Sequence, residues 1–243
     1  MKINVIASGS KGNCTWLKTS ANENILLDVG IPYKRIAQAM DNEAVDYAFV
    51  THEHGDHANP TAIQTLLERG TEIYMSEGTR FTLKLEKRHN LHIVRAHLDM
   101  PLVEFGTCKF NALRTFHDAT EPNTFSIFAD GERLLYATDT RHVPIWNDGR
   151  AFTILMIEAN FSNAALEKSS IDEWRKKRIY ENHLSIENVL SYFDWLKRYE
   201  KITGEFSQLK EVHLMHISKR HGDGTEFAEK VAEVIGDIRI YTH

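Results

Sequence analysis

The segment Tyr47-Ala48-Phe49-Val50-Thr51-His52-Glu53-His54-Gly55-Asp56-His57 decides the fold that we predict for this chain. It passes directly from the apolar residues of a buried strand to three imidazoles and a carboxylate. Because alternate residues of an extended segment share a face, His52 and His54 can reach one metal ion. Asp56 and His57 follow in a turn and can reach a second ion, and these donors suit zinc, manganese or iron. A chance HxHxDH string is expected only roughly 0.002 times in a chain of this composition, so we interpret the segment as a metal-binding loop.

The composition is typical of a compact, enzyme-sized protein. The chain has 243 residues, of which 42% are hydrophobic and 26% charged. It can therefore bury a sizeable core and does not need a metal ion to stabilise its fold. A net charge of −5 argues against a protein that binds polyanions with its whole surface, although a local basic patch can still do so. No repeat or Pro/Gly-rich linker interrupts the sequence, and we expect one domain over residues 1–243.

Cysteine usage and hydropathy predict a cytoplasmic protein with no membrane partner. The two cysteines, Cys14 and Cys108, favour buried free thiols in a reducing compartment over a disulfide framework. The apolar runs are far shorter than the roughly 20 residues of a membrane span. The N-terminus meets Ser8 and Gly9 too early for the apolar core of a signal peptide.

Short apolar runs alternate with amphipathic segments along the chain. We expect strands at Ile3 to Ala7, Ile25 to Val29, Tyr47 to Thr51, Phe125 to Ala129, Leu134 to Thr138, Thr153 to Ala159 and Val212 to His216. We expect helices after Asn59-Pro60, from Ser185 to about Lys201, and from about Thr225 to Ile235. Asp130-Gly131 between two apolar runs predicts a tight hairpin, because both central residues of a type I′ turn need positive φ. These patterns predict an α/β or α+β sandwich.

The order of the polar motifs resembles that of the metallo-β-lactamase superfamily over nearly the whole chain. The HxHxDH loop after a strand is followed by His117 in Thr115-Phe116-His117-Asp118-Ala119, Asp139 in Ala137-Thr138-Asp139-Thr140, and His216 in Leu214-Met215-His216-Ile217. The resemblance implies a four-layer αββα sandwich, with two mixed β-sheets flanked by helices. It also implies a hydrolase with two divalent metal ions, for which zinc is expected and manganese or iron is acceptable.

The same resemblance implies a ligand for each position of a dinuclear centre. His52, His54 and His117 would bind one ion, Asp56, His57 and His216 the other, and Asp139 would bridge them. Asp28, in Ile25-Leu26-Leu27-Asp28-Val29-Gly30, would orient the metal-binding loop without binding metal itself.

Three further motifs resemble the WalJ/YycJ-type branch of the superfamily, which is related to RNase Z. They are Ser8-Gly9-Ser10-Lys11-Gly12-Asn13, Glu158-Ala159-Asn160 and His183-Leu184-Ser185. The branch implies that His183, supported by Glu158, protonates the departing oxygen of a phosphodiester, while Asp56 can also orient the attacking water. Ser8, Ser10 and Asn13 are candidate phosphate contacts, and a plain tight turn is an equally good interpretation of their loop.

The polar segment from Ser162 to Asn182 is long for a minimal fold of this kind and is a candidate lid or interaction surface. Within it, Arg175 to Arg178 is interpreted as a solvated helix face rather than a nucleic-acid contact. Trp174, Tyr192 and Trp195 could stack on bases, but aromatic residues at helical spacing usually belong to the core, and we assign them no role.

The function that we expect is a metal-dependent phosphodiesterase acting on nucleic acid, specifically a DNA exonuclease. Two cations in such a site can lower the pKa of a bound water to about 7, which removes the need for a side-chain nucleophile. One alternative is a glyoxalase II-like or lactonase-like hydrolase of a carboxylic ester, thioester or lactone. Another is a non-enzymatic metal-binding scaffold or sensor. The sequence leaves open the native metal, the choice between DNA and RNA, and the oligomeric state.

Overall fold

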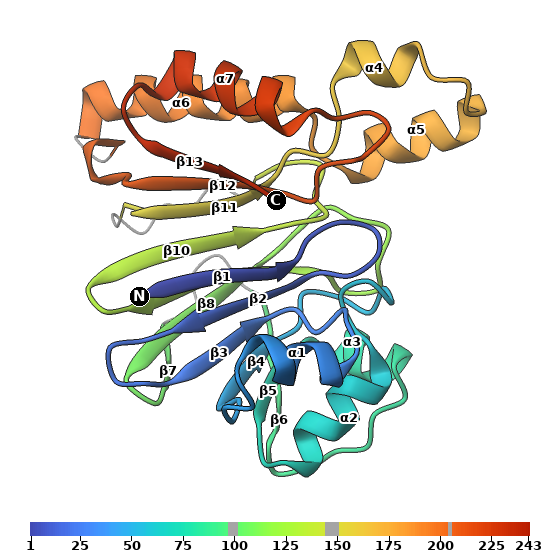
Figure 1. The fold of residues 1–243 in the computed structure, drawn as a ribbon, viewed down its shortest axis with the longest axis vertical. Helices are drawn as coiled ribbons and strands as arrows, with labels where there is room; N and C mark the ends of the chain where they lie inside the picture. Colours follow the sequence, from blue (N-terminus) through green and yellow to red (C-terminus); the bar gives the residue numbers. More distant parts are fainter. Residues whose placement is uncertain (97–101, 144–150, 204–205) are drawn as a thin grey trace. The chain divides into compact units, whose positions relative to one another are not determined.

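The computed structural model describes residues 1–96, 102–143, 151–203 and 206–243 (Figure 1). Its backbone contacts divide the chain into two compact units. Unit 1 comprises Met1–Arg114 and Ala119–Gly131, and unit 2 comprises Thr115–Asp118 and Glu132–His243. The single domain expected over residues 1–243 stays a prediction. No helix in the described ranges is long and apolar enough to cross a membrane.

Unit 1 contains a six-stranded mixed sheet with the strand order β1-β2-β3-β4-β5-β6. Its strands are β1 (Lys2–Ala7), β2 (Cys14–Lys18), β3 (Asn24–Leu27), β4 (Tyr47–Phe49), β5 (Glu72–Met75) and β6 (Leu91–Ile93). The first three strands are antiparallel, whereas β3 to β6 run parallel. Since β3 and β4 are parallel neighbours, Asp28 and Thr51, which follow them, meet at the same edge of the sheet.

Helices α1 (Tyr33–Ala39) and α2 (Pro60–Glu68) cover one face of this sheet, and α3 (Glu77–Thr82) follows β5 (Figure 1). Ile36 and Ile63 pack with the buried residues of β3 to β5 in one apolar cluster. The Asn59 side chain accepts a hydrogen bond from the amide of Ala62 and caps α2, as its sequence pattern predicts. Helix α2 thus starts directly after the HxHxDH loop.

The opposite face of β4 packs against the three remaining strands of unit 1. These are β7 (Val103–Phe105), β8 (Cys108–Arg114) and β9 (Asn123–Ala129). The Phe49 ring meets those of Phe105, Phe110 and Phe125 edge to face, with centroids 5.1, 4.9 and 5.3 Å apart, respectively. Strand β4 is therefore buried on both faces, which holds the start of the HxHxDH loop in place.

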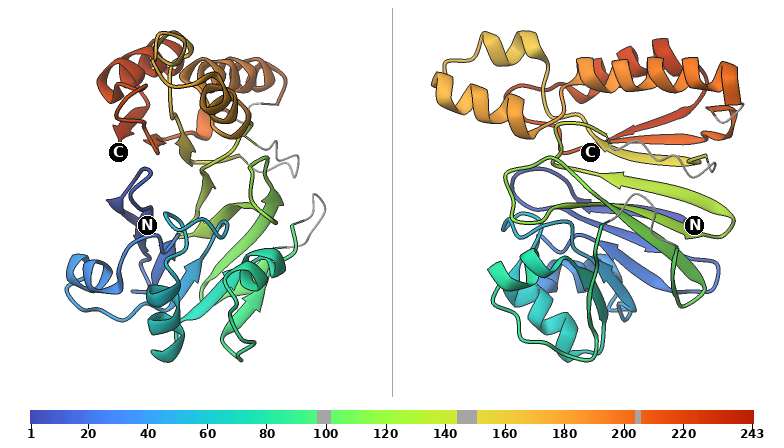
Figure 2. Two further views of the ribbon diagram at one scale, coloured as in Figure 1. Left: turned by 90° about the vertical axis from the view of Figure 1, so that its right-hand side faces the viewer. Right: turned by 180° about the vertical axis from the view of Figure 1, so that it is seen from behind.

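Unit 2 contains the four parallel strands β10 (Glu132–Ala137), β11 (Ile154–Glu158), β12 (Glu211–Met215) and β13 (Arg239–Thr242). The second sheet has the strand order β13-β12-β11-β10-β9-β8-β7. Helices α6 (Ile186–Thr203) and α7 (Gly224–Ile235) lie side by side and pack on the strands of unit 2 through Val189, Phe193, Phe227 and Val231 (Figure 2). Asp139, Glu158 and His216 lie at the carboxyl ends of β10, β11 and β12.

Helices α4 (Asn163–Glu167) and α5 (Glu173–Asn182) and the short 3-10 helix η1 (Phe206–Gln208) complete unit 2. Trp174 of α5 is 69% exposed, so the core placement that is usual for aromatic residues at helical spacing does not apply to it. Trp195 is 36% exposed and stacks on Tyr192, which packs against the core. Helix α5 is mostly polar and has no continuous apolar face to bury its tryptophan.

All seven predicted strands and all three predicted helices are present, with ends that differ by a few residues. The predicted turn at Asp130-Gly131 is confirmed, because the two residues have φ of 55° and 72° and join neighbouring strands. Both cysteines are free and buried, as expected. The sequence patterns missed strands β2, β5, β6, β7, β8 and β13 and helices α1, α3 and α4.

Candidate metal centre

The carboxylate of Asp28 organises the HxHxDH loop of unit 1. Asp28 is fully buried, and its Oδ1 accepts hydrogen bonds from the amide and the hydroxyl of Thr51, at 2.8 and 2.9 Å. Its Oδ2 lies 2.7 Å from Nδ1 of His57. A carboxylate only accepts, so this contact places a proton on Nδ1 and leaves the lone pair of His57 on Nε2. The predicted orienting role of Asp28 agrees with these contacts.

Two glycines allow the loops of unit 1 to approach closely. A Cβ on Gly30 would lie 1.7 Å from the carbonyl oxygen of Asp56, and a Cβ on Gly12 would lie 2.7 Å from the carbonyl oxygen of Gly30. The amide of Asn13 donates to the carbonyl of Asp56 at 2.6 Å. The glycine-rich loop of residues 8–13 thus packs directly against the metal-binding loop.

The Asn13 side chain links the glycine-rich loop to His57 of the metal-binding loop. Its Oδ1 accepts from the amide of Gly9 at 2.8 Å, and its Nδ2 lies 2.9 Å from Nε2 of His57. Asn13 is buried, whereas Ser10 is exposed. The geometry therefore favours a tight turn that supports His57, and the phosphate-binding role of Ser8, Ser10 and Asn13 stays a prediction.

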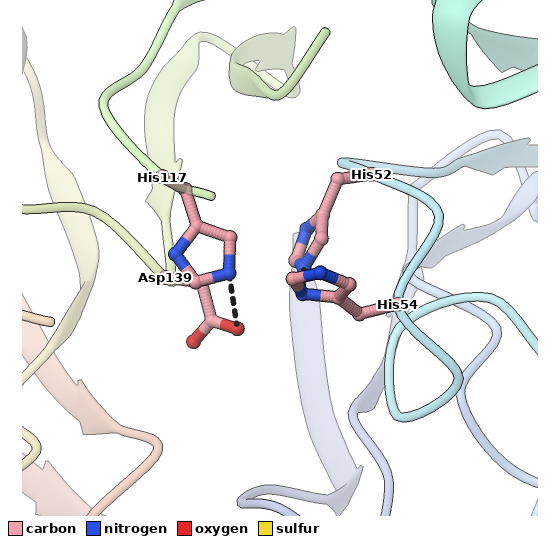
Figure 3. Close-up of side chains that lie close together, drawn as sticks. All are labelled: His52, His54, His117 and Asp139. Atoms are coloured by element: carbon pink, nitrogen blue, oxygen red, sulfur yellow. Dashed lines mark hydrogen bonds and ion pairs between the residues drawn. The ribbon is translucent and has the colours of Figure 1, made fainter. Parts of the chain in front are cut away.

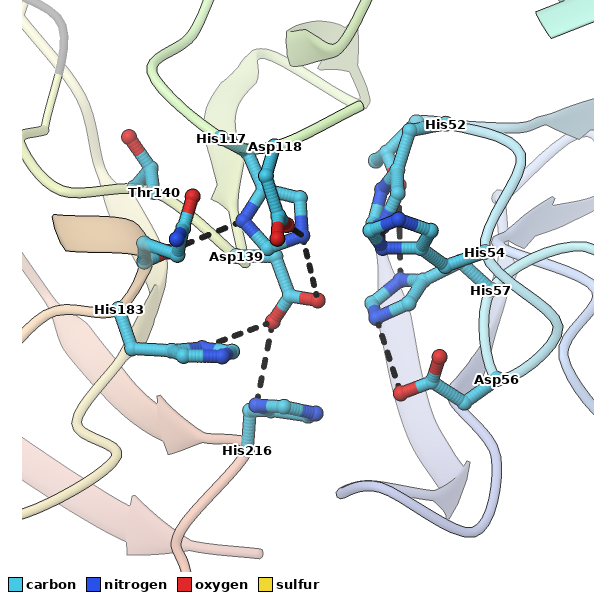
Figure 4. A network of polar contacts seen from close by, with 12 residues as sticks. His52, His54, Asp56, His57, His117, Asp118, Asp139, Thr140, His183 and His216 are labelled. Atoms are coloured by element: carbon cyan, nitrogen blue, oxygen red, sulfur yellow. Dashed lines mark hydrogen bonds and ion pairs between the residues drawn. The ribbon is translucent and has the colours of Figure 1, made fainter. Parts of the chain in front are cut away.

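His52 and His54 turn their ring nitrogens toward each other, as Figure 3 shows. Nε2 of His52 and Nδ1 of His54 are 3.1 Å apart. Two ring nitrogens bound to one tetrahedral zinc ion lie about 3.3 Å apart, given the usual zinc–nitrogen bond length. The pair therefore fits a single ion. Asp56 places its Oδ2 3.6 Å from Nε2 of His57 and is partly exposed (Figure 4).

Glu53 of the same motif points away from these donors. Its Oε1 accepts from the amide and the hydroxyl of Thr120, both at 2.7 Å. It ties the loop to the segment that precedes β9 and leaves the three histidines and Asp56 as the donors of unit 1.

Unit 2 gathers a second group of donors around Asp139. Its Oδ2 lies 3.6 Å from Nε2 of His117, and its Oδ1 lies 3.1 Å from Nδ1 of His216 (Figures 3 and 4). Nδ1 of His117 donates to the carbonyl of Asn182 at 3.1 Å, which leaves its Nε2 as the available donor atom for a metal. Both Asp139 and His216 are buried.

Glu158 positions two histidines of unit 2. Its Oε1 lies 2.7 Å from Nδ1 of His183 and 3.0 Å from Nδ1 of His216, while its Oε2 accepts from the amides of Leu184 and Thr140. Glu158 is fully buried, whereas the His183 side chain is 20% exposed. The side-chain Nδ2 of Asn160 donates to the carbonyl of His216 at 2.8 Å. Glu158 thus holds the Nδ1 side of the His183 ring, while part of the side chain faces solvent.

The ionisation of these groups follows from their neighbours. Burial alone would lower the pKa of His183, but the carboxylates of Glu158 and Asp139 outweigh it and hold the pKa well above the ordinary value of 6.5. Burial would likewise raise the pKa of Glu158, yet the imidazoles of His183 and His216 hold it below its usual value. Burial lowers the pKa of His117, partly offset by Asp139, and this favours the neutral form that binds metals.

Three of the candidate residues have left-handed backbone conformations. Asp28, Asp139 and His216 have φ of 60°, 46° and 54°. Aspartate and histidine enter this region more often than most residues other than glycine, at some cost in backbone energy. Such backbone geometry directs each side chain back over the end of its strand.

The sequence prediction missed the supporting residues. Asn13 was a candidate phosphate contact, with a plain tight turn as an equal alternative, and Gly30, Thr51, Asn160 and Asn182 were not assigned any role. Their contacts join segments far apart in the chain, such as residues 13 and 57 or 117 and 182, and no local pattern reports them. Of these residues, only Gly30 had a signal in the sequence, since it follows Asp28 by two positions at the end of a predicted strand.

Comparison with known proteins identifies similar chains. A family model described as a β-lactamase superfamily domain matches residues 23–203. The chain is 28% identical to exodeoxyribonuclease WalJ of Streptococcus pneumoniae, over 90% of this chain and 82% of that protein. The match extends beyond the loops to most of both sequences.

Solved structures show the same fold. The metallo-β-lactamase fold protein YhfI from Bacillus subtilis gives a TM-score of 0.70 at 16% identity and covers 99% of this chain and 95% of its own. A diphosphatase from the PhnP family gives 0.65 at 17% identity, with coverage of 99% and 94%. These likenesses confirm the predicted fold, with its two mixed sheets flanked by helices.

Substitution of Gly30 tests the close approach of the loops. Gly30→Ala is expected to reduce the free energy of unfolding by at least about 2 kcal/mol, because the new methyl group meets the backbone of Asp56. Urea denaturation measures the change. Gly55→Ala, in the metal-binding loop but with open space at its Cβ, is the matched control, with a change within about 0.5 kcal/mol. Equal effects of the two substitutions would contradict the packing described here.

Substitution of Asp28 tests its support of the metal-binding loop. Asp28→Asn is expected to weaken zinc binding about 10–100-fold, since the charged partner of His57 is lost. Competition with a chromogenic chelator measures the affinity. Asp41→Asn provides a control on an exposed aspartate with a similar φ of 51°, where affinity should change less than about twofold. An Asp28→Asn variant with the zinc affinity of the wild type would show that Asp28 does not support the metal-binding loop.

Proposed function

Because the chain belongs to the β-lactamase superfamily, we propose that the donors of units 1 and 2 serve one dinuclear metal centre that hydrolyses nucleic acid. The chain is a metal-dependent hydrolase with the metallo-β-lactamase fold. In this proposal His52, His54 and His117 hold one ion, and Asp56, His57 and His216 hold the other. Asp139 bridges them. Family membership and the converging donors within each unit support this assignment.

The donor chemistry fits divalent transition metals. Neutral imidazole and carboxylate suit zinc first and also manganese or iron, and several of these histidines carry the proton on the nitrogen that faces a supporting oxygen. When bound, such ions supply positive charge for the phosphate oxygens and acidify a water molecule. The side chains of this chain supply positioning and proton transfer.

The contact between His183 and Glu158 supports a phosphodiester rather than a thioester as substrate. Glu158 fixes the Nδ1 proton of His183 and keeps the ring charged, so that the partly exposed ring can donate its other proton. An alkoxide leaving from phosphorus needs that proton. A thiolate leaving from a thioester needs it less, because thiols have a pKa near about 8.5. A held imidazolium therefore favours phosphodiester hydrolysis over thioester hydrolysis.

Asp56 has the second positioning role in the proposed reaction. Its carboxylate is partly exposed beside His57 and can accept a hydrogen bond from the attacking water. DNA is the substrate that we propose, supported by the similarity to exodeoxyribonuclease WalJ. Removal of one terminal nucleotide at a time is the corresponding mode of cleavage.

Cleavage of labelled nucleic acids tests the proposal directly. End-labelled single- and double-stranded DNA and RNA are incubated with the enzyme and manganese or zinc. We expect DNA to be shortened stepwise, and EDTA to stop the reaction. The Asp56→Asn, His57→Ala double variant, purified identically, should lose at least about 100-fold in rate. If the wild type cuts none of these substrates, or the variant cuts as fast as the wild type, the proposal fails and thioesters and lactones are assayed next.

The proton-donor role of His183 has a separate test that uses the leaving group. His183→Ala is expected to slow cleavage of a thymidine dinucleotide by about 10²–10⁴-fold. Its effect on the p-nitrophenyl ester of thymidine monophosphate should be much smaller, because nitrophenolate departs without a proton. Glu158→Gln should show the same pattern in weaker form. Equal losses on both substrates would mean that His183 positions substrate or metal and does not donate a proton.

A further inference from the structure

A cavity of about 260 Å³ lies in unit 2 beside the exposed part of His183. Helix α5 forms one wall, and the loop after β12 forms another. The polar and aromatic side chains of the lining are Arg175, Arg178, Arg220, His183, His221 and Trp174, with isoleucines between them. We call this cavity the α5 groove. It contains His183, whose side chain is 20% exposed.

The charge of the α5 groove is positive, although the protein as a whole is acidic. Three arginines line it and no carboxylate is among the described lining residues, although Arg175 pairs with Asp172, just outside the lining, at 3.3 Å. Arg178 is held by Asp118 at 2.7 Å, which fixes its direction, while the exposed guanidinium of Arg220 has no ion-pair partner in the parts of the chain that the structure describes. An unneutralised arginine beside a fixed one attracts phosphate groups.

Trp174 adds a flat apolar surface to this cationic groove. Its indole is 69% exposed on a helix that is mostly polar, so it contributes little to the core. Aromatic side chains next to a cationic track are the usual stacking platform for the bases of single-stranded nucleic acid.

We propose that the α5 groove binds one nucleotide of a single-stranded nucleic acid, with its base stacked on Trp174 and its phosphate near Arg220. This inference rests on the proposed nuclease function and assigns the residues that recognise the strand. The volume of about 260 Å³ is near the lower end of the roughly 300–1,000 Å³ of small-molecule pockets, so the groove suits one nucleotide rather than several. A strand held there lies against His183, which explains why the groove and the proton donor share a wall. The expectation that Arg175 to Arg178 form a solvated helix face then applies only to Lys176 and Lys177, because Arg175 and Arg178 line the groove.

Binding of a cleavage-resistant strand tests the α5 groove apart from catalysis. The metal-loaded enzyme is titrated into fluorescein-labelled phosphorothioate oligothymidylate and into its abasic analogue, which has equal charge and no bases. Fluorescence anisotropy gives the dissociation constants. Trp174→Ala should weaken binding of the oligothymidylate about tenfold and leave the abasic strand within about twofold, because only the base stacks. Trp174→Tyr should restore most of the affinity.

Arg220→Gln tests the phosphate contact. It should weaken both strands and reduce the slope of log affinity against log salt by about 0.7, the value for one contact with a single strand. Lys177→Gln is the control. Lys177 is an exposed cation of helix α5 that pairs with Glu181 and does not line the groove. Its affinity and salt slope should stay near those of the wild type.

The outcomes separate the α5 groove from the nuclease proposal. If the wild type cuts DNA but the Trp174 and Arg220 variants bind both strands as the wild type does, the groove inference is wrong and the nuclease proposal stands. An equal loss on both strands for Trp174→Ala overturns base stacking. Competition by polyglutamate as strong as that by oligothymidylate would assign the groove to an acidic polypeptide instead. If the wild type neither binds nor cuts nucleic acid, both proposals fail.

Discussion

The buried carboxylate of Asp28 is the interaction on which the geometry of unit 1 depends. A carboxylate that is buried away from water is stable only when both oxygens accept hydrogen bonds. Here Thr51 donates to one oxygen of Asp28 and His57 to the other. The ends of two parallel strands and the last histidine of the HxHxDH loop are therefore locked together by one group. The close packing at Gly30 then excludes other loop conformations. The histidines acquire their directions before any metal arrives, which reduces the entropy lost on binding.

Unit 2 uses the same principle with a different residue. Glu158, also fully buried at the end of a parallel strand, binds two imidazoles and two backbone amides at once. In each unit a strand-end carboxylate fixes the histidines, and these histidines come from the loop of a neighbouring strand or from a helix boundary. The proton transfer and the strand binding that we propose both depend on this arrangement, because His183 takes part in both.

The sequence was sufficient for the parts of the protein that are local. The HxHxDH loop, the cap at Asn59 and the Asp130-Gly131 turn each have their determinants within a few residues. Strands such as β6, with three residues, are too short for a periodic signal, and β8 is buried on both faces for much of its length, which removes the alternation. Asp139 and His216 were found only through family resemblance. The roles of Asn13 and Trp174 depend on distant contacts and on the polarity of a whole helix, and no short pattern could indicate them.

The left-handed backbone at Asp139 and His216 restricts how this site can be redesigned. Changing the metal preference of a protein usually means exchanging ligands, for example histidine for cysteine or aspartate for glutamate. At these two positions any new side chain must also tolerate positive φ, so the exchange carries a conformational cost that is independent of its affinity for the metal. His52, His54 and His117 have ordinary backbone conformations. Of the proposed ligands, these three histidines, like Asp56 and His57, can be exchanged without that conformational cost.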